Sequence, residues 1–139
     1  MKLFERKVAL VTGAGGGIGL ATAIAFAEAG ASLVVADNNA ALLEDAAGEL
    51  RAAGHEVLAV TCDVTDRSQV TAMLGQAVRT YGQLDAAFNN AGINCDGAPV
   101  LETEDDEFDR ILRCQPARRV ELYEGRTSPD DGARKRCNR

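Results

Sequence analysis

The stretch that decides the fold is Lys7–Gly19, which reads K-V-A-L-V-T-G-A-G-G-G-I-G. The four consecutive apolar residues Val8–Val11 are typical of a strand buried on both faces, and a glycine-dense turn follows them directly. Residues Ile18–Glu28 contain no proline and no glycine after Gly19, so they predict a helix. The chain is therefore expected to begin with a strand, a tight turn and a helix.

This turn is a candidate binding site for an anion. Backbone N–H groups at the start of a helix have no partner within the helix, and the helix dipole favours negative charge there. Glycine suits such a turn because a Cβ atom would hold a phosphate away from the backbone. The spacing is Thr12-Gly13-x-x-x-Gly17-Ile18-Gly19, which is related to the G-x-G-x-x-G fingerprint without matching it. The alternative is that the glycines are purely structural.

The chain continues as a regular alternation of apolar strands and amphipathic helices. Strands are expected at Ser32–Asp37, Glu56–Cys62 and Leu84–Asn89. One helix is expected at Ala40–Ala53, and a second begins after a cap at Thr65 or Asp66 and ends at Tyr81. A further helix is expected to begin at the capping box Thr103–Asp106. The expected buried stripes are Leu42, Leu43, Ala46, Ala47 and Leu50, then Val70, Met73, Leu74, Ala77, Val78 and Tyr81, then Phe108, Ile111 and Leu112. Helices that end at Gly30, Gly54 and Gly82 and lead into strands predict right-handed βαβ units. The result is a parallel sheet covered on both faces.

Composition places the chain among one-domain globular proteins, because 46% of its 139 residues are hydrophobic and 26% are charged. A net charge of −6 argues against nucleic acid and against an anionic membrane as partners. Glu5, Arg6 and Lys7 interrupt any early apolar run, so no signal peptide is expected, and no apolar stretch approaches membrane-spanning length. The four cysteines have neither metal-ligand nor disulfide spacing, which fits a reduced, cytoplasmic protein without a metal site.

A second candidate binding residue is Asp37, at the carboxyl end of the second expected strand. A carboxylate at this place can accept both hydroxyl groups of an adenosine ribose, and it repels a 2′-phosphate. The neighbours Asn38 and Asn39 and the turn residue Gly16 carry no positive charge, so NAD is favoured over NADP. The alternative is that Asp37 only caps the next helix or lies in a solvated loop.

Two further signatures follow the third and fourth expected strands, namely Asp63-Val64 and Asn89-Asn90-Ala91-Gly92. Together with Thr12–Gly19 and Asp37, they make residues 5–113 similar to the short-chain dehydrogenase/reductase family. The resemblance implies an α/β fold, a Rossmann-like, doubly wound parallel sheet, here truncated after the fourth strand and the fourth helix. It also implies NAD-dependent hydride transfer on a small alcohol or ketone, in a family that is usually homo-oligomeric.

The resemblance also implies roles for the two later signatures. Asp63 and Val64 would frame the adenine, while Asn90, Ala91 and Gly92 would line the cofactor and brace the centre of the sheet. Taken singly, Asp63 is also compatible with a helix cap, and Asn89-Asn90 with a simple turn.

Past Arg113 the resemblance stops. The family carries a catalytic Asn, a catalytic Ser and a Tyr-x-x-x-Lys pair beyond this point, and residues 114–139 match none of them. Tyr123 is followed four residues later by Thr127 instead of Lys, and Ser128 precedes a proline. We therefore expect no catalytic residue and no dehydrogenase activity in this chain.

The chain is expected to divide into an NAD-binding half domain, residues 1–113, and a basic, disordered tail, residues 114–139. The tail contains 7 Lys and Arg against 4 Asp and Glu, whereas residues 1–113 contain 8 against 17. A one-nucleotide shift of the reading frame at Cys114 permits a string that begins V-N-L-R-G, as the family pattern has it there, so we expect an out-of-frame tail. Codons at Cys114–Arg119 that do not permit this string would contradict the hypothesis. The other functions considered are a non-catalytic nucleotide-binding module and an inert product.

Overall fold

The computed structural model describes residues 1–92 and Asp106, and these contain four strands and three helices. The strands are β1 (Val8–Thr12), β2 (Ser32–Asp37), β3 (Val57–Thr61) and β4 (Ala86–Asn89), and the helices are α1 (Gly17–Glu28), α2 (Ala40–Ala52) and α3 (Arg67–Tyr81). Each lies where the sequence predicts it, with ends that differ by up to two residues. The expected fourth helix lies, apart from Asp106, outside the described residues, and so does the tail 114–139.

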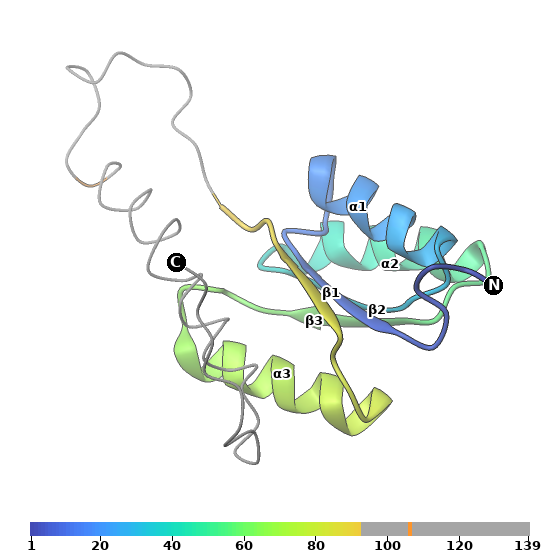
Figure 1. Cartoon of the computed structure of the whole chain (residues 1–139). Helices are drawn as coiled ribbons and strands as arrows, with labels where there is room; N and C mark the ends of the chain where they lie inside the picture. Colours follow the sequence, from blue (N-terminus) through green and yellow to red (C-terminus); the bar gives the residue numbers. More distant parts are fainter. Residues whose placement is uncertain (93–105, 107–139) are drawn as a thin grey trace, which may run out of the picture.

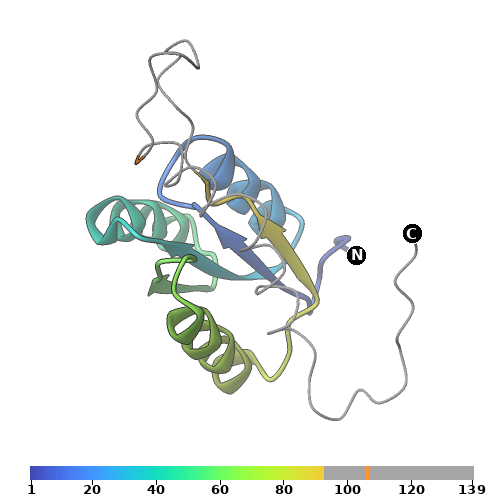
Figure 2. The same cartoon turned by 90° about the vertical axis from the view of Figure 1, so that its left-hand side faces the viewer.

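The strands form one parallel sheet in the order β3-β2-β1-β4. The first two crossovers move outward from β1 to β3, and the third returns to the other side of β1. Figure 1 shows the consequence, with α1 and α2 on one face of the sheet and α3 on the other, and the turned view in Figure 2 keeps the same separation. Right-handed crossovers require this change of face when the direction reverses. The doubly wound, Rossmann-like sheet expected from the sequence is therefore confirmed.

The core lies on both faces of β1 and β2. All five residues of β1 and the four central residues of β2 are buried, as expected for continuous apolar strands between two helical layers. Alternate side chains point to opposite faces, so Leu10 and Val34 pack in one cluster with Met73 of α3. Val11 and Val35 belong to the other cluster, beneath α1 and α2.

Side chains fix the helix ends. Asn39 caps α2 by accepting the N–H of Leu42 at 3.1 Å, and Asp66, one of the two candidate caps, caps α3 by accepting the N–H groups of Ser68 and Gln69. Hydrogen bonds from Ser68 and Gln69 lower the pKa of Asp66. Gly82 ends α3 with a φ of 76°, a left-handed conformation that glycine adopts without strain.

Two residues of the expected buried stripes are exposed, so the prediction was wrong for them. Leu42 in α2 is 51% exposed and Val78 in α3 is 50% exposed. At 3.6 residues per turn, each lies about 80–90° from the centre of the buried residues of its helix, outside the contact with the sheet. Tyr81 does face the sheet as expected, and its hydroxyl donates to the carbonyl oxygen of Leu33 at 3.3 Å. Burial, and then the charge of Glu56, raise the pKa of Tyr81.

No helix in residues 1–92 has the length and apolarity that a bilayer crossing requires.

The start of β4 is tied to β1 by Asp85. Its carboxylate accepts the backbone N–H of Val8 at 2.8 Å, the ammonium of Lys7 at 3.0 Å and the side-chain amide of Gln83 at 2.9 Å. Desolvation, the largest influence, raises the pKa of Asp85, but the hydrogen bonds and the charge of Lys7 outweigh it, so the pKa is lowered overall. Because residues 77 positions apart are joined here, the carboxylate helps to fix the register of β4.

We expect Asp85→Ala to lower the free energy of unfolding by about 1–3 kcal/mol at neutral pH, because the buried N–H of Val8 loses its acceptor. Since folding lowers the pKa of Asp85, its contribution is complete above the unfolded carboxyl pKa of about 3.9 and is lost as the pH falls through the folded value. Urea unfolding of both proteins across this range measures the effect, with the exposed Asp45→Ala as the control. A difference that does not shrink in acid would contradict this assignment.

Candidate nucleotide-binding site

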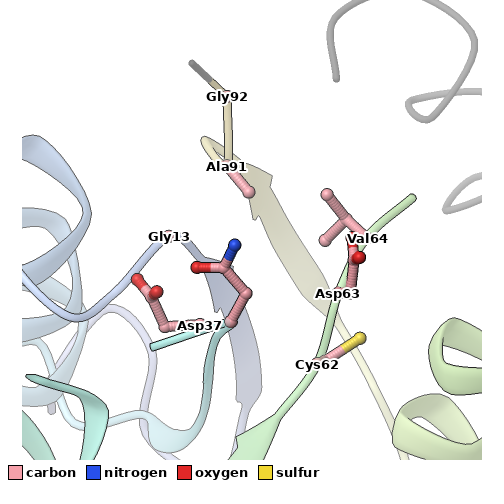
Figure 3. A pocket seen from close by; sticks show the side chains of 8 residues that line it. Gly13, Asp37, Cys62, Asp63, Val64, Ala91 and Gly92 are labelled. Atoms are coloured by element: carbon pink, nitrogen blue, oxygen red, sulfur yellow. The ribbon is translucent and has the colours of Figure 1, made fainter. Parts of the chain in front are cut away.

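The residues singled out from the sequence meet at the carboxyl edge of the sheet. A pocket there is lined by Gly13, Asp37, Asn38, Cys62, Asp63, Val64, Ala91 and Gly92. These residues follow four different strands, and the pocket lies beside the point where the strand order reverses, between β1 and β4. Ligands of open α/β sheets bind at such a switch point. Figure 3 shows Asp37 on one side of the pocket and Asp63 with Val64 on the other, with Ala91 and Gly92 above the end of β4.

The glycine turn between β1 and α1 leaves its middle open. Gly13 and Gly17 have φ values of 68° and 53°, in the left-handed region where other residues are strained. A Cβ atom on Gly16 or Gly17 would meet nothing within 4 Å. No side chain caps the start of α1, and its first turn contains no acidic residue. The helix dipole and the N–H groups at the start of α1 are thus available to an anion.

At Gly19, in contrast, the structure leaves no room for a side chain. A Cβ atom on Gly19 would overlap the carbonyl group of Gly13 and come within 2.8 Å of Nδ2 of Asn90. A Cβ on Gly13 would lie 2.9 Å from the same nitrogen. Only glycine lets α1 begin this close to the end of β1, and this close approach is what places the N–H groups of the turn at the edge of the sheet.

Thr12 joins the ends of β1 and β4. Its fully buried hydroxyl oxygen accepts the N–H groups of Asn90 and Ala91, both at 3.1 Å. The side-chain amide of Asn90 donates to the carbonyl oxygen of Gly13 at 3.3 Å. Asn89 belongs to β4 and pairs with Thr12, so the turn considered for Asn89-Asn90 is wrong for Asn89. Hydrogen bonds of Asn90 and Ala91 thus join the end of β4 to Thr12 and Gly13 at the end of β1.

Asp37 lies beside the glycine turn. Its Oδ2 atom accepts the N–H of Gly15 at 2.9 Å, and its Oδ1 atom accepts the N–H of Asn39 at 3.0 Å. The N-cap of α2 is Asn39, so the alternative that Asp37 only caps this helix is wrong. A carboxylate held in this way faces the pocket with lone pairs left for the hydroxyl groups of a ligand.

The far wall follows β3. Oδ1 of Asp63 accepts the N–H of Thr65 at 2.8 Å, a turn contact, whereas the cap of α3 is Asp66. The alternative of Asp63 as a helix cap is therefore wrong. Val64 is buried next to it and provides an apolar surface. Burial, followed by the charges of Asp63 and Asp66, raises the pKa of Cys62 to about 11, so its thiol is protonated at neutral pH and acts as a small apolar group.

The lining of the pocket thus has two carboxylates and no lysine, arginine or histidine among its residues. Within residues 1–92, no three His, Cys, Asp or Glu side chains group as a metal site would require. The arrangement suits a ligand with hydroxyl groups toward Asp37, a flat apolar part against Asp63 and Val64, and an anionic part at the start of α1.

Of the residues named from the sequence, Gly13, Asp37, Asp63, Val64, Ala91 and Gly92 line the pocket. Thr12 and Gly19 support it from beneath, and Gly17 and Ile18 form the exposed start of α1, where the side chain of Ile18 is 71% exposed. Sequence reasoning missed Gly15, Asn38 and Cys62 as parts of the site. Their positions carried the signal, because Gly15 lies inside the glycine run and the other two adjoin Asp37 and Asp63.

Comparison with known sequences agrees with this geometry. A family model described as "short chain dehydrogenase" matches residues 7–116. The cis-4-hydroxycyclohexanecarboxylate dehydrogenase of Sinomonas cyclohexanicum is 43% identical over 109 residues, which are 78% of this chain and 43% of that protein. The versicolorin reductase of Emericella nidulans is 43% identical over 110 residues, 78% of this chain and 41% of that protein. The chain spans about two fifths of the length of these curated relatives.

Solved structures give the same picture. An NAD⁺-bound xylitol dehydrogenase is 39% identical with a TM-score of 0.85, over 90% of this chain and 48% of that one. A short-chain dehydrogenase/reductase from Burkholderia phymatum in complex with NAD is 34% identical with a TM-score of 0.83, over 90% of this chain and 44% of that one.

The close approach at Gly19 leads to a paired prediction. Gly19→Ala should lower the free energy of unfolding by about 1–3 kcal/mol, because the new methyl group overlaps the carbonyl group of Gly13. Gly48→Ala is the matched control, since Gly48 also lies in a helix but a Cβ there meets nothing within 4 Å. This control should raise the stability by about 0.5–1 kcal/mol. Chemical denaturation measures both, and equal effects of the same sign would refute the packing argument.

Proposed function

Because this chain belongs to the short-chain dehydrogenase/reductase family, we propose that its first 92 residues bind the adenosine half of NAD. The observation that carries the proposal is that Asp37 lies beside the glycine turn that leads into α1, whose start has no side-chain cap. In this proposal the pyrophosphate lies at the glycine turn, on the N–H groups at the start of α1. The ribose hydroxyls would donate to Asp37, and the adenine would lie against Asp63 and Val64.

The roles proposed for the remaining residues follow from their places. Thr12 and Asn90 hold the turn and the end of β4 in position, and Gly13, Gly17 and Gly19 leave room for the backbone to approach the pyrophosphate. Ile18 is largely exposed, so a cofactor would cover apolar surface there. Ala91 and Gly92 line the pocket just after β4 and would line the cofactor there.

We propose NAD rather than NADP as the cofactor. The ribose side of the pocket contains the carboxylate of Asp37 and the uncharged Asn38, and no cationic side chain lies among the residues that line the pocket. A 2′-phosphate would be placed against a carboxylate without a compensating charge. The NAD-bound xylitol dehydrogenase and the Burkholderia phymatum protein with NAD support this choice by their similarity.

In the whole protein, the proposed reaction is hydride transfer between NAD and an alcohol or ketone. The names of the dehydrogenase and the reductase that are 43% identical support this class of substrate. When bound, NAD supplies the hydride acceptor. The described residues bind and orient the adenosine half, and the proton-transfer groups expected for the family have no match in this sequence. We therefore propose that these 139 residues bind the cofactor without turning over substrate, in a reduced, cytoplasmic setting.

Titration with NADH tests the cofactor proposal. The full chain should bind NADH and ADP-ribose, and NADPH about tenfold or more weakly, which corresponds to roughly 1.4 kcal/mol. Asp37→Ala should weaken NADH binding, because it removes the acceptor for the ribose hydroxyls. It should also reduce the difference in affinity between NADH and NADPH, because it removes the repulsion of the 2′-phosphate. Asp45→Ala, an exposed carboxylate of α2, should change neither affinity. Failure of the wild-type chain to bind NADH or ADP-ribose would refute the proposal.

The absence of turnover is tested separately. The purified chain, freed of host dehydrogenases, should produce no NADH from NAD with a panel of secondary alcohols, sugars and hydroxy acids. Its NADH fluorescence titration shows in the same preparation that the chain is folded and binding-competent. NAD-dependent turnover that co-purifies with the chain and is lost in Asp37→Ala would contradict this part of the proposal.

A further inference from the structure

We propose that Asp37 is also the positioning residue of the glycine turn, so that the residue assigned to the ribose holds the phosphate-binding backbone in place before any ligand arrives. This inference deepens the proposed NAD site and takes its functional meaning from it. Its structural part concerns the ligand-free chain alone.

Hydrogen bonds between the two chain segments continue beyond the carboxyl ends of β1 and β2. The last register pair joins Thr12 to Ala36, and the N–H of Ala14 still donates to the carbonyl oxygen of Ala36 at 3.0 Å. One residue later the side chain of Asp37 replaces the backbone, because Oδ2 accepts the N–H of Gly15 at 2.9 Å. The carboxylate therefore extends the ladder into the turn by one further bond.

The other end of this carboxylate is fixed as well. Oδ1 accepts the N–H of Asn39, and the side chain of Asn39 in turn accepts the N–H of Leu42 in the first turn of α2. The turn after β1 is thus linked through Asp37 to the start of α2. Hydrogen bonds to an ionised carboxylate are stronger than those between neutral groups, so one side chain can hold both segments.

The space around Gly15 agrees with this role. A Cβ atom on Gly15 would lie 2.9 Å from Oδ2 of Asp37, closer than real Cβ atoms come, and 3.1 Å from Cβ of Leu42, which is tighter than most such contacts. The neighbouring Gly16 is a natural contrast, because a Cβ there would meet nothing within 4 Å. Glycine at position 15 therefore leaves room for the carboxylate, whereas glycine at position 16 faces open space.

The consequence is that recognition of the ribose and of the phosphates is coupled through one side chain. Removing the carboxylate should lower the affinity for a ligand that has the diphosphate but no ribose hydroxyls. A carboxylate that acted on the ribose alone would leave the binding of such a ligand unchanged. The two roles of Asp37 can thus be separated by experiment.

The first experiment measures hydrogen exchange of the residue-15 amide by NMR in the ligand-free full chain. Asp37→Ala should increase its exchange rate about tenfold or more, because the amide loses its acceptor. Gly15→Ala should also increase it, since the methyl group displaces the carboxylate, whereas Gly16→Ala and Asp45→Ala should not. An unchanged rate in Asp37→Ala overturns the inference. If that variant does not fold, the comparison of Gly15→Ala with Gly16→Ala decides it, and equal rates overturn it.

The second experiment titrates ADP and 2′,3′-dideoxy-ADP into the wild type and Asp37→Ala. The inference requires that the variant also binds dideoxy-ADP more weakly, by about threefold or more, although this ligand has no hydroxyl for Asp37. Equal affinity of both proteins for dideoxy-ADP overturns the coupling and leaves the ribose assignment intact. If the wild type binds neither nucleotide, the proposed function fails, and the exchange rates alone decide the positioning role.

Discussion

The rest of the structure depends on the close approach of Gly19 to the carbonyl group of Gly13. Any side chain at position 19 would overlap this carbonyl, so α1 can begin beside the end of β1 only because the residue is glycine. The same carbonyl oxygen accepts a hydrogen bond from the side-chain amide of Asn90. One backbone group is therefore the meeting point of β1, of α1 and of the end of β4, which lies 77 positions further along the sequence.

Polar side chains take over where the parallel ladder stops. Beyond the ends of the strands the backbone segments diverge, and their N–H groups need acceptors within the fold. Thr12 provides one for the end of β4, and Asp37 provides one for the turn after β1. At the opposite edge of the sheet Asp85 does the same for the first residue of β1. In each case a short side chain extends the sheet by one or two bonds, and at the carboxyl edge Asp37 also lines the pocket.

Much of this arrangement could be predicted from the sequence, for identifiable physical reasons. The fold follows from apolar runs that end in glycine turns, since a buried parallel strand and a right-handed crossover leave few alternatives. The exposure of Leu42 and Val78 could not be predicted, because an apolar residue at the margin of a helical stripe is buried or exposed according to the width of the contact. That width depends on how closely each helix approaches the sheet, which is a tertiary property. The link between Asp37 and Gly15 was missed for a similar reason, since the two residues are 22 positions apart and their contact depends on the path of the turn.

The electrostatics of the pocket indicate which forces would act on a dinucleotide. The chain has a net charge of −6, and two of the side chains that line the pocket are carboxylates, so the overall field repels an anionic ligand. Long-range attraction therefore contributes nothing to binding, and the diphosphate depends on short, directional donors at the start of α1. Such donors are effective only when the turn is held in one conformation before the ligand arrives, because the free energy of ordering the turn would otherwise reduce the affinity. In the proposed site, Asp37 contributes to this preorganisation through its hydrogen bond to the N–H of Gly15, although its own charge opposes the diphosphate. Under the proposed function, preorganisation of the glycine turn is thus the reason for a carboxylate beside it, at a place where charge alone would favour a lysine.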